Sequence, residues 1–402
     1  MEDTTATPNE MIWKVVRAAE PTLRALRQDL HAHPETAWHE VRTTSVVMEQ
    51  LNSLGLAPKT LDGKTGVVAD VTGDPSGPLV ALRADMDALP FEDVKMVPYR
   101  SENVGVVHAC GHDVHTTCLI GAARALQKLA EGGFLPGRVR LMFQPAEEVI
   151  PGGALRLLET GALEGVEQVF ALHCDPRVEV GRLAVRTGPI TAAVDAVSLL
   201  LSGPGGHAAR PYLTSDVVAA LADVISRLPT LLSRRIDARA DVSVMWGCIR
   251  AGTSGNTIPN QAEALGNVRV FDPTVWSSLG ELIPELIRQV VAPYRAEAAI
   301  GYTVGVPPAM NDPACTASIS HAAESILGAD HVDETPRSMG GEDFAWLLQK
   351  IPGSLARLGV RSPDRSEAPD LHSGAFDVDE RAIGIGAAVL AATAAQVLAE
   401  LR

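Results

Sequence analysis

Apolar and polar residues follow a helical rhythm near the start of the chain and an alternating strand-and-helix rhythm after it. A helical pattern runs over residues 11–54, and Pro34, next to His33, predicts a break in it. Short β-branched runs then alternate with amphipathic stretches, which is typical of an α/β domain with a mostly parallel sheet flanked by helices. The predicted strands are Val67–Val71, Leu79–Ala84, Arg138–Gln144 and Gln168–His173, and the predicted helices are Val114–Glu131 and Ala154–Thr160.

The middle of the chain has a different order of elements. The pattern predicts a β-α-β-β-α-β unit, the order of a ferredoxin-like α+β domain. Its parts are Ala192–Ser202, Ser215–Leu232 with Ser215 as the N-cap, Val242–Ile249, Ala262–Phe271, Pro273–Ala292 and Ala298–Val306. From Asp312 the first rhythm resumes, with a polar loop at 361–370 and a helix at the end. We therefore expect residues 188–308 to be a domain inserted between 1–187 and 309–402.

Composition and charge narrow the possible partners. The chain has 402 residues, of which 46% are hydrophobic and 21% charged, as in soluble proteins of two domains. A net charge of -15 argues against nucleic acid or an anionic membrane as a partner. The start of the chain is polar, and the apolar stretch 383–398 is short and Ala-rich, so we expect neither a signal peptide nor a membrane span. Five scattered cysteines fit a reducing cytoplasm.

The run HACGHDVH, residues 108–115, is the strongest sign of chemistry. A thiol and an imidazole two residues apart, in a glycine-containing turn before a helix, can hold one metal ion or share two. A lone pair of this kind is more often a core cysteine beside a surface histidine. Three histidines and a cysteine within eight residues favour a metal site, with Cys110 and His112 ranked above His108 and His115. Nearby carboxylates could orient the histidines; the candidates are Asp85, Asp87 and Asp113.

Two adjacent glutamates, Glu147 and Glu148, follow the predicted strand 138–144. Adjacent residues in an extended chain point to opposite sides, so one carboxylate can bind metal while the other faces a water molecule. Paired glutamates are usually only solvated. Their place after a buried strand and a proline favours function, because a charge near a buried strand needs a partner.

Two distant histidines complete the candidate set. His173 ends a predicted strand and His372 follows the polar loop, and either one alone indicates nothing. Together with the residues above they supply nitrogen, sulfur and oxygen donors in a number that suits two metal ions. The predicted ligands are Cys110, His112, Glu148, His173 and His372. Glu147 is then left as the general base.

The inserted domain adds polar candidates. Arg269 on a predicted strand could hold a carboxylate, and His207 in a glycine-rich turn could donate to an oxyanion. An exposed strand charge and an ordinary turn residue explain them equally well. Asn256 lies in a turn between two predicted strands.

Ordered motifs along nearly the whole chain resemble the zinc aminopeptidase/carboxypeptidase-like amidohydrolases, within them the hippurate hydrolase and auxin-conjugate hydrolase branch. The motifs are LRQDLHAHPE at 26–35, LRADMDALP at 82–90, HACGHD at 108–113, QPAEE at 144–148, GGHAARP at 205–211, GNTIPNQA at 255–262, GGEDFA at 340–345 and LHSGAF at 371–376. The resemblance implies two divalent ions on the five ligands above, with Glu147 as base. It also implies that the insert is a lid and a homodimerisation module from which His207, Asn256 and Arg269 approach the substrate, His207 in its own or the neighbouring subunit's site.

The resemblance predicts hydrolysis of the amide bond of an N-acyl amino acid or a similar small conjugate. Relatives outside this branch have a His where Asp85 stands, whereas this chain has a Cys-type site, so the metal of those relatives cannot be carried over. Zinc, manganese, cobalt or nickel could fit the ligands. A dipeptidase or carboxypeptidase, or an N-acetyl-diaminopimelate-type deacetylase, would use the same site. Two other classes stay open: an inactive metal-binding scaffold, and a thiol enzyme with Cys110 as nucleophile, which would resist chelators.

Overall fold

The computed structural model describes residues 7–61 and 65–402, and these residues form two compact units. The larger unit comprises the described residues up to Ile190 together with 310–336 and 346–402. The smaller unit comprises 191–309 and 337–345. The segment 337–345 lies outside the predicted insert. It belongs to the smaller unit because Ala192 N–H donates to Ser338 O and a main-chain bridge joins Thr191 to Ser338.

Two helices open the larger unit, with the predicted break between them. Helix α1 (Pro8–Ala32) begins at a capping box, in which Thr7 and Glu10 satisfy each other's main-chain N–H groups. Helix α2 (Val41–Ser53) follows after a turn that contains Pro34. Glu40 is the N-cap residue of α2 but makes no side-chain capping bond to it.

An eight-stranded sheet forms the centre of the larger unit, in the order β1-β2-β4-β3-β5-β16-β6-β15. The inner pairs β3–β4, β3–β5 and β5–β16 are parallel, whereas β1–β2, β2–β4 and β16–β6 are antiparallel. Every residue of β3 is buried, as expected of a strand covered on both faces. The strands are β1 (Lys59–Thr60), β2 (Val67–Thr72), β3 (Leu79–Asp85), β4 (Arg138–Gln144), β5 (Gln168–Glu179), β6 (Leu183–Val185), β15 (Val332–Glu334) and β16 (Gly353–Arg361).

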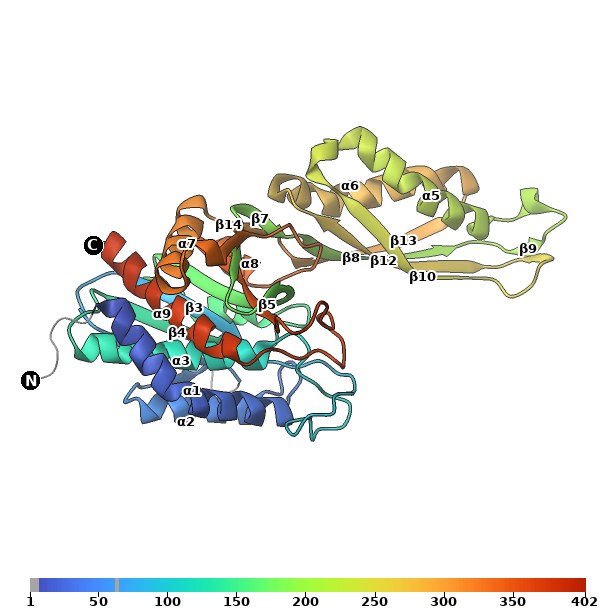
Figure 1. Cartoon of the computed structure of the whole chain (residues 1–402). Coiled ribbons are helices and arrows are strands. Elements are labelled where there is room, and N and C mark those ends of the chain that lie inside the picture. The colour runs from blue at the N-terminus through green and yellow to red at the C-terminus, as the bar shows by residue number, and fades with distance from the viewer. Residues whose placement is uncertain (1–6, 62–64) are drawn as a thin grey trace, which may run out of the picture. The chain divides into compact units, whose positions relative to one another are not determined.

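Helices α1, α3 and α9 pack on one another beside this sheet and share one hydrophobic core with it (Figure 1). The helices of this unit after α2 are α3 (His112–Glu131), α4 (Gly153–Glu159), α7 (Pro313–Leu327) and α9 (Arg381–Glu400). The short α8 (Ala345–Leu348), and the two-stranded pair β7 (Gly188–Thr191) with β14 (Ala309–Asn311), lie at the unit boundaries. Among the described residues α9 alone has the length and hydropathy of a membrane span, but 72% of that window is buried inside the protein, as in a core helix.

The structure confirms the predicted α/β class and corrects one strand end. Strand β5 does not stop at His173 but continues to Glu179, because its partner β16 continues beside it and His173 pairs with Arg357. His173 is therefore an interior strand residue. The hydrophobic pattern predicts no strand at 353–361, yet these residues form β16, an inner strand of the sheet.

The smaller unit has the predicted β-α-β-β-α-β order around its own core. Its four-stranded antiparallel sheet runs β10-β12-β8-β13, the ferredoxin-like arrangement. The elements are β8 (Ala193–Ser202), β9 (Gly206–His207), α5 (Val217–Arg235), β10 (Ser243–Ala251), β11 (Thr257–Ile258), β12 (Gln261–Val270), α6 (Pro273–Val291) and β13 (Glu297–Val306). The N-cap prediction was wrong: Asp216 caps α5 through Ala219 N–H, and the Ser215 hydroxyl donates to Arg295 O instead.

Candidate metal centre

The predicted site residues of the larger unit come together where β3, β4 and the first turn of α3 meet. Strands β3 and β4 are parallel neighbours, so the residues that follow Asp85 and Gln144 lie at the same edge of the sheet. Gly111, with φ of 90°, turns the chain into α3 directly after Cys110. A Cβ at this position would lie 2.7 Å from Cys174 Sγ, so the turn requires glycine.

The surroundings of His112 leave its Nε2 available for a metal. Its Nδ1 lies 3.2 Å from Asp87 Oδ1, and because a carboxylate only accepts, Nδ1 carries the proton. Nε2 is buried and has no hydrogen-bond partner. Burial lowers the pKa of His112, but the Asp85 carboxylate and the hydrogen bond to Asp87 outweigh it and hold that pKa well above its usual value. The imidazole is thus oriented and aimed by carboxylates, as metal-binding histidines are.

His115 and His108 are weaker ligand candidates, although ligand atoms of His115 lie within 4.8 Å of those of Asp85 and His112. The Cys174 N–H donates to His115 Nε2 at 2.8 Å, and His115 Nδ1 in turn donates to Asp85 Oδ1 at 2.5 Å, so both ring nitrogens are used. His108 is buried with neither nitrogen bonded, and burial lowers its pKa to about 3. Its ring centroid lies 6.2 Å from that of His31, and among the described residues His108 belongs to no group of potential metal ligands.

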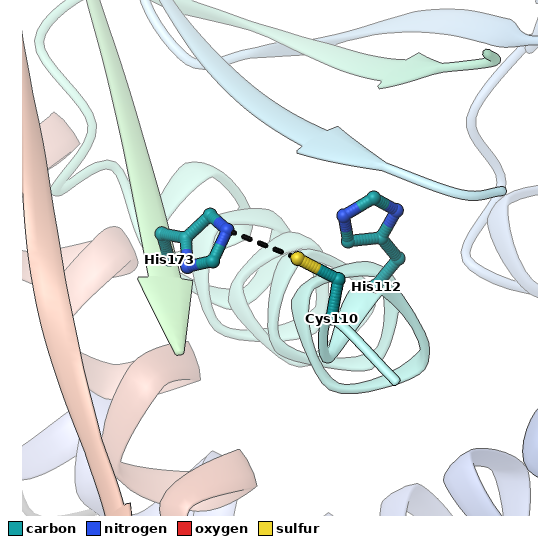
Figure 2. A group of neighbouring side chains, drawn as sticks. All are labelled: Cys110, His112 and His173. Carbon is teal, nitrogen blue, oxygen red and sulfur yellow. Dashed lines mark hydrogen bonds between the residues drawn. The ribbon is translucent and has the colours of Figure 1, made fainter. Parts of the chain in front are cut away.

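His173 and Cys110 extend the site from β5. The His173 Nδ1–H donates to Cys174 O at 2.8 Å, which leaves Nε2 unprotonated, and Nε2 lies 3.5 Å from Cys110 Sγ. Figure 2 shows the thiol pointing at this ring, with the His112 ring rising from the start of α3. Potential ligand atoms of Cys110, His112 and His173 all lie within 4.8 Å of one another.

Glu148 and His372 form a second group with the same thiol. His372 is held by its main-chain N–H, which donates to Ala109 O at 2.8 Å, and its Nε2 lies 3.3 Å from Glu148 Oε1. Atoms of Cys110, Glu148 and His372 also lie within 4.8 Å of one another. The structure therefore brings all five predicted ligands together, in two groups that share Cys110.

The donor set fits divalent cations. Glu148 Oε1 is buried with the His372 ring as its neighbour at 3.3 Å, and among the described residues the buried His112 Nε2 has no hydrogen-bond partner. Burial, followed by the charge of Glu148, raises the pKa of the Cys110 thiol well above its usual value. A bound cation would lower that pKa again by stabilising the thiolate. Sulfur, imidazole and carboxylate together are the ligands of zinc and its neighbours in the transition series.

Asp87 fixes the two glutamates by their main chain. Its Oδ1 accepts from Glu147 N–H at 3.0 Å and its Oδ2 from Glu148 N–H at 2.9 Å, in addition to the bond from His112. The Glu147 carboxylate lies beside the candidate ligands, and its Oε2 is 4.0 Å from His112 Nε2. Of the three aspartates predicted to orient histidines, Asp87 serves a ligand, Asp85 serves His115 and Asp113 serves His31.

Comparison with known families identifies this arrangement. The model of a family described as Peptidase family M20/M25/M40 matches residues 81–396, which hold all five candidate ligands and Glu147. The chain belongs to this family. As a member of it, the chain is a metal-dependent amidohydrolase, and the resemblance seen in the motifs is confirmed.

Individual M20 relatives match over most of the chain. N-acetyl-L-cysteine deacetylase of Bacillus subtilis is 37% identical, over 90% of this chain and 85% of its own length. A solved Bacillus subtilis structure, described as a dinuclear metal binding peptidase from the M20 family, is 34% identical with a TM-score of 0.83, over 95% of this chain and 99% of that one. A Rhodococcus jostii protein that carries the name of a glutamate–cysteine ligase is 47% identical over 95% of this chain, but the chain spans only 48% of that protein's length.

The polar candidates of the smaller unit lie at two ends of its sheet. His207 in β9 pairs with Thr257, and Ala208 N–H donates to Asn256 O, so His207 and Asn256 are neighbours just past the Ser202 end of β8 (Figure 1). Arg269 pairs with Val194 near the opposite end of β8. Since Gln261 pairs with Ser202, the eight residues of β12 between that end and Arg269 span about 26 Å.

The tautomer of His207 and the bonds of Arg269 suit the predicted contacts. Ala209 N–H donates to His207 Nδ1, so a neutral ring carries its proton on Nε2 and can donate from there. Arg269 donates from Nε to Asn267 Oδ1 and from Nη1 to Met339 O. These two hydrogen bonds hold the Arg269 guanidinium in a fixed position.

Proposed function

We propose that this chain hydrolyses the amide bond of N-acyl amino acids and uses two divalent cations to do so. The observation that carries the proposal is the pair of ligand groups that share Cys110, with the Glu147 carboxylate beside them. Cys110 with His112 and His173 would hold one cation, and Cys110 with Glu148 and His372 the other. The named activity of the Bacillus subtilis deacetylase relative supports an N-acylated amino acid as the substrate class.

Glu147 is assigned the proton transfers. Cations held by these ligands would supply Lewis acidity to the amide carbonyl and to the attacking water. The Glu147 carboxylate takes a proton from the attacking water and delivers it to the nitrogen of the departing amino acid. Asp87 keeps Glu147 in place, because it accepts from the main-chain N–H groups of Glu147 and Glu148 at the same time.

Substrate recognition is assigned to the smaller unit, as a lid, and requires two subunits. His207 would donate to the oxyanion, and Asn256 and Arg269 would hold the carboxylate of the amino acid. The separation of about 26 Å along β12 exceeds the length of such a substrate, so one copy cannot bring all three residues to one molecule. We infer a homodimer in which each site takes Arg269 from one subunit and His207 with Asn256 from the other.

An unpartnered apolar face on the smaller unit supports the dimer. Leu200 of β8, Leu265 of β12 and Met245 of β10 are all exposed, and the register of the strands places them on one face of the sheet. Large exposed apolar side chains that gather on one sheet are typical of interaction surfaces. Strand β10 is also an edge strand, whose free main-chain groups can pair with another chain.

A chelation and reconstitution assay tests the proposed function. The purified protein is stripped with a chelator, reloaded separately with Zn²⁺, Mn²⁺, Co²⁺ or Ni²⁺, and assayed on N-acetyl and N-benzoyl amino acids, N-acetyl-diaminopimelate and dipeptides. We expect activity to disappear on stripping, to return with at least one ion, and to favour N-acyl amino acids over dipeptides. Preference for dipeptides would replace the proposed substrate class with that of a peptidase.

Point variants separate the catalytic role from metal binding. Glu147→Gln should keep the bound cations and lose activity by several orders of magnitude, on the order of 1,000-fold or more. Glu159→Gln, a surface change on α4, is the matched control and should retain activity. Equal activity in Glu147→Gln would end the assignment. Chelator-resistant activity that is abolished by alkylation of Cys110 would instead indicate a thiol enzyme.

A further inference from the structure

Glu40 is a buried carboxylate that contacts the loop of the two active-site glutamates from a distant part of the sequence. The residue is fully buried, and it sits before α2, more than a hundred positions from that loop. Its Oε1 accepts from Ala146 N–H at 2.7 Å and from Trp38 N–H at 3.0 Å. Its Oε2 is buried and has no hydrogen-bond partner among residues 7–61 and 65–402. The Glu40 carboxylate therefore accepts hydrogen bonds from two main-chain N–H groups that lie outside helix α2.

Both of those N–H groups belong to strained residues. Trp38 has φ of 66° and Ala146 has φ of 53°, in the left-handed region that non-glycine residues rarely enter. Such a conformation persists only where surrounding contacts hold it. For Ala146 those contacts are the Glu40 carboxylate on its N–H and Gly153 N–H on its carbonyl oxygen.

The turn at Ala146 decides where the next two residues point. Directly after it, Glu147 and Glu148 both direct their N–H groups at Asp87. Gly153 lies so close that a Cβ there would be 1.7 Å from Pro145 O, so the loop is tightly closed. If Ala146 relaxed to an ordinary right-handed or extended conformation, the two glutamates could not keep these directions.

We propose that Glu40 is a positioning residue, which holds Ala146 in its left-handed conformation so that Glu147 faces the substrate water and Glu148 faces the other candidate ligands. This role rests on the proposed function, in which Glu147 is the base. It needs an acceptor oxygen at this place and not a negative charge. Consistent with that, burial raises the pKa of Glu40 to about 7, which favours the neutral acid.

Three variants with a matched control test the role. Glu40→Ala removes the acceptor, Glu40→Gln keeps it without the charge, and Glu40→Asp keeps the charge on a side chain about 1.5 Å shorter. The control is Glu35→Ala. The Glu35 carboxylate accepts from Arg42 and Thr43 in the first turn of α2, and among the described residues it has no hydrogen bond to residues 145–148, so its loss should destabilise the same region without moving the glutamates. All are assayed at saturating cation, with kcat, KM and urea unfolding measured.

We expect kcat to fall on the order of 100-fold in Glu40→Ala with little change in KM, because a displacement of about 1 Å at a catalytic group costs that much. Glu40→Gln should restore kcat to within roughly fivefold of the wild type, and Glu35→Ala should lower stability while keeping kcat. Wild-type kcat in Glu40→Ala would overturn the role. So would a Glu40→Gln as impaired as Glu40→Ala, or an equal loss of kcat in Glu35→Ala.

Two further measurements keep the test decisive. If Glu40→Ala does not fold, Glu40→Asp replaces it, and wild-type kcat in that variant would overturn the role. Glu147→Gln is assayed in parallel to separate the two proposals. Activity in Glu147→Gln would mean that the proposed function is wrong, whereas an inactive Glu147→Gln beside a fully active Glu40→Ala would mean that only the role of Glu40 is wrong.

Discussion

Substitution of Asp87 by Asn is the perturbation that tests most directly how the metal centre is built. Asp87 is buried and accepts three hydrogen bonds, from His112 Nδ1 and Glu147 N–H on Oδ1 and from Glu148 N–H on Oδ2. Asparagine has nearly the same shape but only one acceptor oxygen. If that oxygen replaces Oδ1, the amide NH₂ group faces the N–H of Glu148, donor against donor.

The size of the effect follows from that count of bonds. The variant loses one charge-assisted hydrogen bond outright and weakens two others, and a lost bond to a charged group costs about 1.5–3 kcal/mol. We therefore expect the free energy of unfolding to fall by about 2–3 kcal/mol, which is the scale of one buried unsatisfied donor. We expect cation affinity to fall by roughly 10- to 100-fold, because Asp87 orients His112 and carries the main chain of Glu148.

The assay combines cation competition with urea unfolding. A chromophoric chelator of known affinity measures the dissociation constant of Zn²⁺, and tryptophan fluorescence follows unfolding, since the chain contains five tryptophans. Asp70→Asn is the matched control. Asp70 lies on β2 of the same sheet, away from the candidate ligands, and its carboxylate accepts from Arg140 at 2.9 Å. A cation affinity of Asp87→Asn within about threefold of that of Asp70→Asn would refute the reasoning. Loss of a residue that orients a metal ligand normally lowers metal affinity at least tenfold.

Further predictions concern the ligands, stability and the subunit arrangement. His112→Ala should lose bound cation by elemental analysis, whereas His115→Gln, which can still donate and accept, should keep it. Burial raises the pKa of Glu40 from 4.5 to about 7, so the folded protein holds this proton more tightly and wild-type stability falls as pH rises through that window. Relative to the wild type, Glu40→Gln should thus gain up to about 3 kcal/mol between about pH 4.5 and about pH 7, measured by urea midpoints. Saturating Zn²⁺ at about a thousand times its dissociation constant should add about 4 kcal/mol to the unfolding free energy of the stripped protein. Co-expressed His207→Ala and Arg269→Ala chains, each inactive alone, should recover roughly a quarter of the sites, because half of the dimers are mixed and each has one intact site; no recovery would exclude the shared site.

Much of the architecture follows from local sequence. The change from helical to strand periodicity predicts the α/β domain, and the strand–helix order of the insert predicts the ferredoxin-like unit, because side-chain direction repeats every 3.6 residues in a helix and every two in a strand. The candidate ligands were also identifiable in the sequence, since thiol, imidazole and carboxylate groups placed after buried strands are costly unless they bind something.

The length of a strand and the capping residue of a helix were harder to predict from the sequence. Nothing in the residues after His173 marks β5 as continuing, because its extension depends on β16, which is nearly two hundred residues later in the chain. Likewise, Ser215 and Asp216 are both good capping residues, and the choice between them depends on the carbonyl of Arg295, which occupies the serine hydroxyl.

What the sequence by itself determined is the inventory: which groups could bind a cation, on which kinds of element, and in which order. Only the tertiary structure decided their roles. His112 and His115 are the same residue type on one turn of α3, yet contacts from Asp87 leave Nε2 of one ring open, and contacts from Asp85 and Cys174 close both nitrogens of the other. A role of this kind depends on partners that only folding brings within about 3 Å, the distance at which a hydrogen bond fixes a tautomer or a backbone turn.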